Sequence, residues 1–117
     1  MAYIQQLLKG LIDPIILSII NRLPMHGYQI AKEMEQRTAG YLKMKGGTVY
    51  PSLMRLERKG LVTSRWEQTS EQKGRRCYQI TERGRQFLAD RLSDWQKFYM
   101  AINKLTQEAN SHSEATQ

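Results

Sequence analysis

Apolar residues recur at helical spacing near the start of the chain, directly after Asp13 and Pro14. These two residues suit the N-cap and the first position of a helix, and Pro24 suits its end. The spacing therefore predicts one buried helix here, preceded by a weaker helical pattern over residues 2–9. Its apolar stripe comprises Ile15, Ile16, Ile19, Ile20 and Leu23.

Two further helices are predicted downstream. The first covers Gly27–Thr38 and is ended by Gly40. The second runs from Gly46 to Lys59 and is followed by Gly60, which suits the position just after a helix end. The apolar side of the first comprises Tyr28, Ile30, Ala31 and Met34, and that of the second Val49, Leu53 and Leu56. A neighbouring face of the second helix carries a polar stripe, which we expect to be exposed: Thr48, Ser52, Arg55 and Lys59.

The composition then changes to that of β-strands. We expect strands over Leu61–Gln68 and Arg75–Thr81, joined by a polar six-residue tip into a β-hairpin. Alternation places Val62, Ser64 and Trp66 on one side of the first strand, and Arg76, Tyr78 and Ile80 on one side of the second.

A last helix is predicted from Glu82 to about Thr106, with Thr81 as its cap. It would be about 37 Å long, which is longer than a small domain needs for its own core. A heptad-like apolar seam runs along it and is typical of a dimer interface. The seam comprises Leu88, Leu92, Trp95, Tyr99 and Ile102.

Three helices followed by a hairpin is the element order of a winged helix-turn-helix. We predict an α+β fold, mainly α, that forms a single compact domain with an extension. Residues 1–81 would form the winged helix-turn-helix with its two-stranded wing, residues 82–106 a C-terminal dimerisation helix, and residues 107–117 a disordered tail.

The net charge of +7 of this 117-residue chain is confined to the predicted domain. Residues 1–81 carry 13 Lys and Arg against 6 Asp and Glu, whereas residues 82–117 carry five of each. Such a surplus of positive charge is typical of a surface that binds a polyanion. Charge alone leaves anionic membrane as an alternative to nucleic acid, but the helix-turn-helix pattern favours double-stranded DNA.

The expected DNA-binding residues lie around the predicted recognition helix and in the wing. Lys43 and Lys45 precede the helix where phosphate contacts are needed, and the polar stripe would face the major groove. Thr48 has the alternative role of capping the helix. The residues are Lys43, Lys45, Thr48, Ser52, Arg55 and Lys59, with Lys73, Arg75 and Arg76 in the wing.

Several classes of protein are disfavoured. No apolar run reaches the ~18 residues of a membrane span, and the single cysteine, Cys77, fits a reducing compartment such as the cytoplasm. His26, His112 and Cys77 are distant in sequence and predict no metal site. No catalytic constellation or cofactor motif is recognisable, so we expect neither an enzyme nor a cofactor.

Three stretches resemble the PadR family of transcriptional regulators. They are MHGYQI (25–30), GTVYPSLMRLERKGLV (47–62) and GRRCYQITERG (74–84), and the resemblance covers about residues 8–105. It implies a winged helix, a C-terminal dimerisation helix and a homodimer that represses transcription from an inverted-repeat operator. Tyr50 matches the motif tyrosine near the start of the recognition helix, where it would contact DNA or pack beneath the helix.

The single C-terminal helix is similar to that of the compact branch of the family. One multidrug-sensing member of that branch carries a tryptophan on this helix, which stacks flat ligands across the dimer. Trp95 falls at the matching place, so the resemblance implies a small aromatic effector bound by Trp95 and Tyr99, whereas a heptad position also suits Trp95 as plain packing. Cys77 stands where the family commonly has arginine, lysine or an aromatic residue. A winged-helix protein-interaction module without specific DNA binding is the alternative function.

Overall fold

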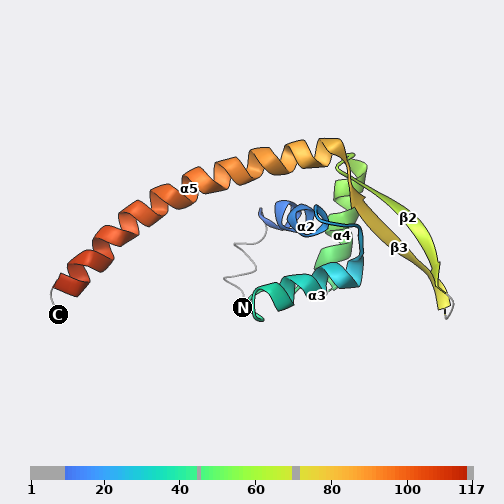
Figure 1. Ribbon diagram of the computed structural model, residues 1–117, viewed down its shortest axis with the longest axis horizontal. Coiled ribbons are helices and arrows are strands. Elements are labelled where there is room, and N and C mark those ends of the chain that lie inside the picture. The colour runs from blue at the N-terminus through green and yellow to red at the C-terminus, as the bar shows by residue number, and fades with distance from the viewer. Residues whose placement is uncertain (1–9, 45, 70–71, 116–117) are drawn as a thin grey trace.

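The computed structural model describes residues 10–44, 46–69 and 72–115, and it is a winged helix with a long helical arm (Figure 1). The predicted fold class, α+β and mainly helical, is confirmed. The weak helical pattern over residues 2–9 lies outside the described residues. In chain order the elements are α2 (Ile12–Ile20), β1 (Met25–His26), α3 (Gly27–Arg37), α4 (Gly46–Arg58), β2 (Val62–Thr69), β3 (Gln72–Ile80) and α5 (Glu82–Ala115).

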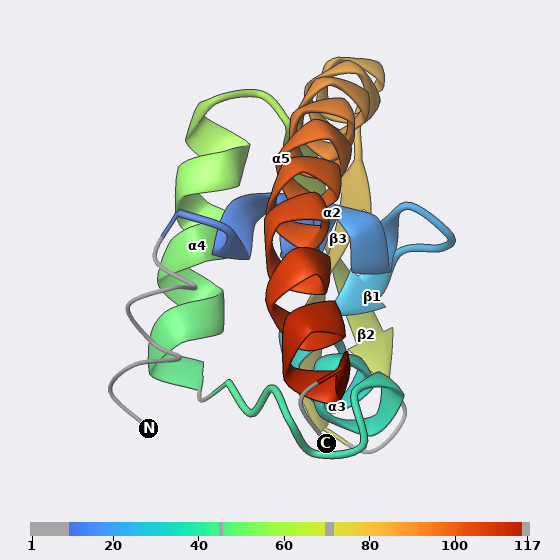
Figure 2. The same cartoon turned by 90° about the vertical axis from the view of Figure 1, so that its left-hand side faces the viewer.

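The core lies where α2, α3 and α4 meet the base of the sheet. Helix α2 lies across the middle of the domain and packs against α3, α4 and β3 (Figure 2). Burial of these side chains from water is the main force that holds the three helices together. The largest fully buried apolar side chains are Ile16, Leu17, Ile20, Ile30, Val49, Leu53, Leu56 and Val62.

The start and end of α2 differ from the prediction. Leu11 occupies the N-cap position, and Asp13 lies inside the first turn, where its carboxylate accepts a hydrogen bond from Arg55 of α4. The prediction that Asp13 caps the helix is therefore wrong. The helix ends at Ile20, and Leu23 is 54% exposed instead of belonging to the buried stripe.

The sheet has three antiparallel strands in the order β1-β3-β2. Strand β1, which has only two residues, pairs Met25 with Tyr78 and His26 with Cys77, and it was not predicted. Strands β2 and β3 pair from Val62 opposite Ile80 as far as Thr69 opposite Gln72. The predicted six-residue tip is wrong, because the strands continue through most of it and only residues 70–71 separate them.

Helix α5 begins as predicted and extends further than predicted. Thr81 accepts a hydrogen bond from the backbone N–H of Gly84, which confirms it as the cap. The helix continues to Ala115, so the predicted end near Thr106 is wrong. Its 34 residues correspond to about 51 Å. Only its first turns pack on α2, and the rest projects away from the domain (Figure 1).

Candidate nucleic-acid interface

The exposed face of α4 is not the predicted polar stripe. Ser52 is 1% exposed and donates a hydrogen bond to the carbonyl of Thr48, so its predicted exposure is wrong. The reason lies in the spacing: Ser52 follows Val49 by three residues and precedes Leu56 by four, which places it on the core stripe. The outward face is instead formed by Thr48, Tyr50, Pro51, Met54 and Arg58.

Arg55 and Lys59 also lie away from the outward face of α4. Arg55 donates hydrogen bonds to Asp13 and to Ser52, both at 3.0 Å, so its guanidinium points toward α2. Together with Lys59 it borders a hollow that Phe87 and Arg91 of α5 also line. These two cations therefore lie on the side of the domain where the helical arm begins, and not beside the wing.

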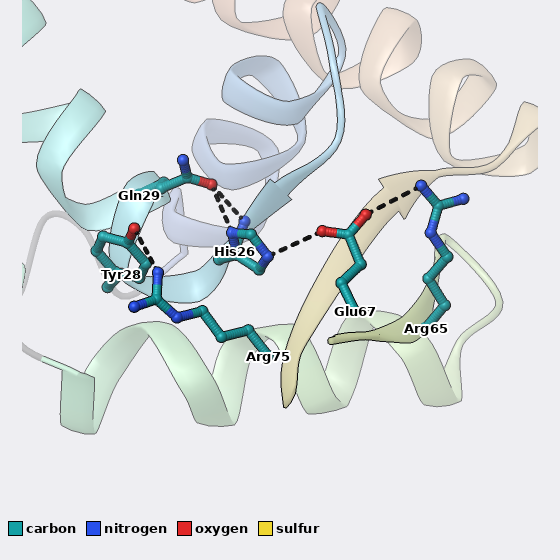
Figure 3. A network of polar contacts seen from close by, with 6 residues as sticks. All are labelled: His26, Tyr28, Gln29, Arg65, Glu67 and Arg75. Carbon is teal, nitrogen blue, oxygen red and sulfur yellow. Dashed lines mark hydrogen bonds and ion pairs between the residues drawn. The ribbon is translucent and has the colours of Figure 1, made fainter. Parts of the chain in front are cut away.

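Two exposed arginines of β3 lie on opposite faces of the wing. Arg75 donates a hydrogen bond of 2.8 Å to the hydroxyl of Tyr28, and its guanidinium lies over that ring (Figure 3). Arg76 donates to Ser64 and lies over the ring of Trp66, 5.0 Å from its centroid. Aromatic contacts of this kind hold a guanidinium in place while its remaining N–H groups stay free for an anion.

A cleft of about 570 Å³ separates the start of α4 from the wing. Its floor requires Gly27, because a Cβ there would overlap the ring of Tyr50. One edge of the Tyr50 ring packs against Gly27 of α3, and the residue remains 44% exposed. The cleft is lined by His26, Gly27, Tyr28, Tyr50, Trp66, Gly74, Arg75, Arg76 and Tyr78.

Three of the lysines predicted to contact DNA differ in how much of them the structure describes. Lys43 is exposed in the connector that leads into α4. Lys45 lies outside the described residues. Lys73 belongs to β3, but its side chain is outside the part of the chain that the structure describes. Of the predicted DNA contacts, the structure therefore brings Tyr50, Arg75 and Arg76 around one cleft.

Sequence reasoning missed Tyr28 as a member of this surface. It was assigned to the apolar side of α3, yet it is 48% exposed and holds Arg75. Helical spacing contains the signal, because Tyr28 precedes the buried Ile30 by two residues, and such pairs do not face the same direction. Trp66 and Met54 are likewise exposed and were not among the expected interface residues.

The seam of α5 divides into a buried start and an uncovered remainder. Leu88 is buried against the domain and Trp95 is half-buried. Beyond Leu88 the described residues of the domain cover little of the helix. The exposed large apolar side chains of α5 are Leu92, Phe98, Tyr99, Met100, Ile102 and Leu105.

Burial changes the acidity of two groups at the base of the wing. Burial raises the pKa of the Cys77 thiol, the Glu67 carboxylate raises it further, and Arg65 acts in the opposite direction. Burial also raises the pKa of Tyr78, against the influence of Arg76. Both groups therefore keep their protons more firmly than they would in water.

Comparison with known proteins gives one consistent family. Residues 16–90 match the Transcriptional regulator PadR-like family. The fold is similar to that of a transcriptional regulator from Clostridium thermocellum, with 28% identity, a TM-score of 0.78, and coverage of 85% of this chain and 96% of that chain. A PadR family transcription regulator from hypervirulent Clostridium difficile is 32% identical, with a TM-score of 0.72 and coverage of 80% and 96%.

A third similar structure is Bacillus subtilis PadR in complex with operator DNA. It is 24% identical, with a TM-score of 0.66, and the match covers 73% of this chain and 48% of that chain. At that identity the likeness shows the shared fold alone. Among the described helices of this chain, none is both long and apolar enough to cross a membrane.

Proposed function

Because the chain belongs to the PadR-like family of transcriptional regulators, whose members are not enzymes, we propose that it binds an inverted-repeat operator as a homodimer and represses transcription. The observation that carries this proposal is the exposed start of α4 beside a wing that presents Arg75 and Arg76. In Figure 1 the start of α4 and the far end of the hairpin lie toward the same end of the domain, away from the start of α5.

Each part of this surface suits one element of duplex DNA. The first turns of a recognition helix enter the major groove, where Thr48 and Tyr50 would meet base edges or phosphates. Met54 is 58% exposed on the same face and would contact a thymine methyl group. The arginines of the wing and Lys43 would neutralise phosphates, which position the protein without reading sequence. Lys45 and Lys73 remain predicted phosphate contacts.

The uncovered seam of α5 supports the homodimer. Apolar side chains at heptad spacing favour pairing of two copies of one helix, and a symmetric dimer reads two half-sites of a palindrome about 34 Å apart. Leu92, Trp95, Tyr99 and Ile102 would form this interface, whereas Leu88 is already buried within its own chain.

A small aromatic effector would bind beside the same seam. Trp95 is half-buried and Tyr99 is exposed, so a flat molecule could stack on the indole between two copies of α5. Such a ligand would weaken operator binding only to the extent that it prefers a dimer with the wrong separation of recognition helices. Trp95→Ala should abolish this binding while the dimer persists, and loss of the dimer instead would assign Trp95 to packing.

The decisive experiment is selection of bound duplexes from a random DNA pool at two salt concentrations. We expect an enriched inverted repeat and binding that weakens as salt rises, since each neutralised phosphate contributes a slope of about −0.9 in log K against log salt. Binding indifferent to salt, with no enriched sequence, would contradict the proposal. That result would favour the alternative, a winged helix that contacts another protein.

A further inference from the structure

Three side chains with metal-binding chemistry converge at the base of the wing, one from each strand. His26 on β1 and Arg65 on β2 both lie opposite Cys77 on β3, and Glu67 follows Arg65 by two residues on the same face of the sheet. The donor atoms of His26, Glu67 and Cys77 all lie within 4.8 Å of one another. This spacing is close to what a single small ion requires of its ligands.

Both ring nitrogens of His26 face acceptor oxygens. The backbone N–H of His26 donates to Oε1 of Gln29 at 2.9 Å, which identifies that atom as the amide oxygen. The ring atom Nδ1 lies 3.0 Å from the same oxygen (Figure 3). A neutral imidazole ring carries a single N–H, so it can donate from only one of its two nitrogens.

The second acceptor belongs to Glu67. Nε2 of His26 lies 3.1 Å from Oε1 of Glu67. A neutral ring therefore leaves one of its two nitrogens against an acceptor oxygen with no proton between them, and these two atoms repel each other unless a positive charge is shared there. A second proton on the ring would supply that charge, and so would a cation bound to both atoms and to the nearby sulfur.

We propose that His26, Glu67 and Cys77 form a binding site for a divalent transition-metal ion of the zinc type. Imidazole nitrogen, thiolate sulfur and carboxylate oxygen are the ligands that zinc takes in proteins, with water completing four-coordination. Sulfur and nitrogen donors argue against calcium and magnesium, which prefer oxygen. Thiolate and carboxylate together carry two negative charges, which match the charge of the ion.

Neighbouring groups already orient two of the ligands. Gln29 holds the far side of the imidazole ring, and Arg65 donates to Oε2 of Glu67 at 3.2 Å, which leaves Oε1 directed at His26. Metal-bound histidines and carboxylates commonly have such partners. Cys77 is buried while Glu67 is partly exposed, so an ion would enter from the carboxylate side.

Binding replaces a proton on sulfur. Burial raises the pKa of Cys77, so the metal-free protein holds a thiol. The thiol loses H⁺ to solvent as the metal–sulfur bond forms, and no oxidation occurs. Since the ligands come from β1, β2 and β3, the bound ion would tie the wing to the strand that leads into α3. We therefore expect metal to raise the temperature of thermal unfolding.

Cobalt(II) provides a direct test with the full-length, chelator-treated protein. The chain has a single cysteine, so a thiolate-to-cobalt charge-transfer band can arise within one chain only from Cys77. We expect that band together with tetrahedral visible bands, saturation at one ion per chain, and displacement by zinc. Absence of the charge-transfer band from the folded protein would overturn the proposal.

Variants separate this site from adventitious binding. Cys77→Ser should abolish the charge-transfer band, and Glu67→Gln and His26→Gln should each weaken binding at least about tenfold. The matched control is His112→Gln, since His112 is the second of the two histidines in the chain, and it should bind cobalt like the wild type. An equal loss in His112→Gln would contradict the assignment.

Because His26 also caps α3, its replacement could unfold the chain. Glu67→Gln provides the independent readout: zinc should raise the unfolding temperature of the wild type by more than that of this variant. An equal rise in both would overturn the proposal. Neither measurement involves DNA, so failure here and failure of the proposed operator binding are distinguishable.

Discussion

The winged-helix region and the arm of α5 beyond Leu88 both contain many apolar residues, but they differ in how far these side chains are buried. In the first, apolar side chains such as Ile16 and Leu53 are fully buried by the same chain. In the second, Tyr99 is 68% and Leu105 67% exposed. A helix gains most of its stability from packing its apolar face. The first region therefore buries its apolar side chains within one chain, whereas those of the arm remain largely exposed.

The difference also separates two kinds of functional residue. The region with its own core places the candidate DNA contacts, because Tyr50, Arg75 and Arg76 are held by neighbours within the chain. The arm would set the distance between two such surfaces in a dimer. Mutations in the two regions should accordingly change different measured quantities.

The largest expected effect is on folding of the winged-helix region. Leu53→Ala removes a fully buried side chain from the centre of the core and should lower the free energy of unfolding by about 2–5 kcal/mol. Chemical denaturation monitored by circular dichroism measures this free energy. Met54→Ala is the matched control. Met54 is the next residue along the helix and is 58% exposed, so its loss should change the free energy of unfolding by less than about 0.5 kcal/mol. Equal effects would contradict the assigned faces of α4.

The next effect is on association of the arm. Ile102→Glu places a carboxylate in the proposed seam, where it would lose water without gaining a partner. We expect the dissociation constant of the dimer to rise about 100-fold, which corresponds to about 2.7 kcal/mol, while each chain keeps its winged helix. Analytical ultracentrifugation measures the dissociation constant, and circular dichroism verifies the fold.

Asn103→Glu adds the same charge one position along the helix and serves as the control for the seam. Asn103 is exposed and lies outside the heptad positions, so this variant should dimerise like the wild type. A wild-type chain that remains monomeric at all concentrations would refute the seam as a dimer interface.

The two regions also differed in how far sequence could predict them. The helices around the core were predicted because burial imposes a 3.6-residue period that is visible in the chain. Ser52 was misplaced because its polar type was given more weight than its spacing from Val49 and Leu56. The end of α5 was misplaced for a similar reason: its polar residues suggested disorder, yet no glycine or proline follows Gly84 to stop the helix.

What could not be predicted depends on contacts between distant residues. Strand β1 has two residues, too few for an alternating pattern, and it exists only because β3 pairs with it. His26 and Glu67 are 41 positions apart and meet through that pairing. For the same reason the sequence indicated no metal site. A short-range motif can identify a recognition helix, but it cannot reveal a cluster assembled across three strands.

A smaller effect concerns the cations of the wing. Arg75→Gln and Arg76→Gln should each weaken operator binding about tenfold and reduce the magnitude of the salt slope by about one. Neither should change dimer dissociation. Lys97→Gln on the arm is the control, because it removes an exposed positive charge outside the proposed DNA-binding surface. Fluorescence anisotropy with the selected operator at several salt concentrations measures both quantities, and equal weakening by Lys97→Gln would mean that only net charge matters.

The smallest expected effect is the response of the buried region to alkaline pH. Burial raises the pKa of Cys77 and of Tyr78, so between the unfolded and folded pKa values the folded chain holds protons that the unfolded chain has lost. The stability that this provides is complete below the ordinary thiol pKa of about 8.5 and is lost as pH rises through the folded values. Denaturation of chelator-treated protein from about pH 7 to about pH 10 should therefore show falling stability. Cys77→Ala should shift the onset of the fall upward, toward the range where Tyr78 ionises, and an unchanged onset would show that the thiol contributes nothing.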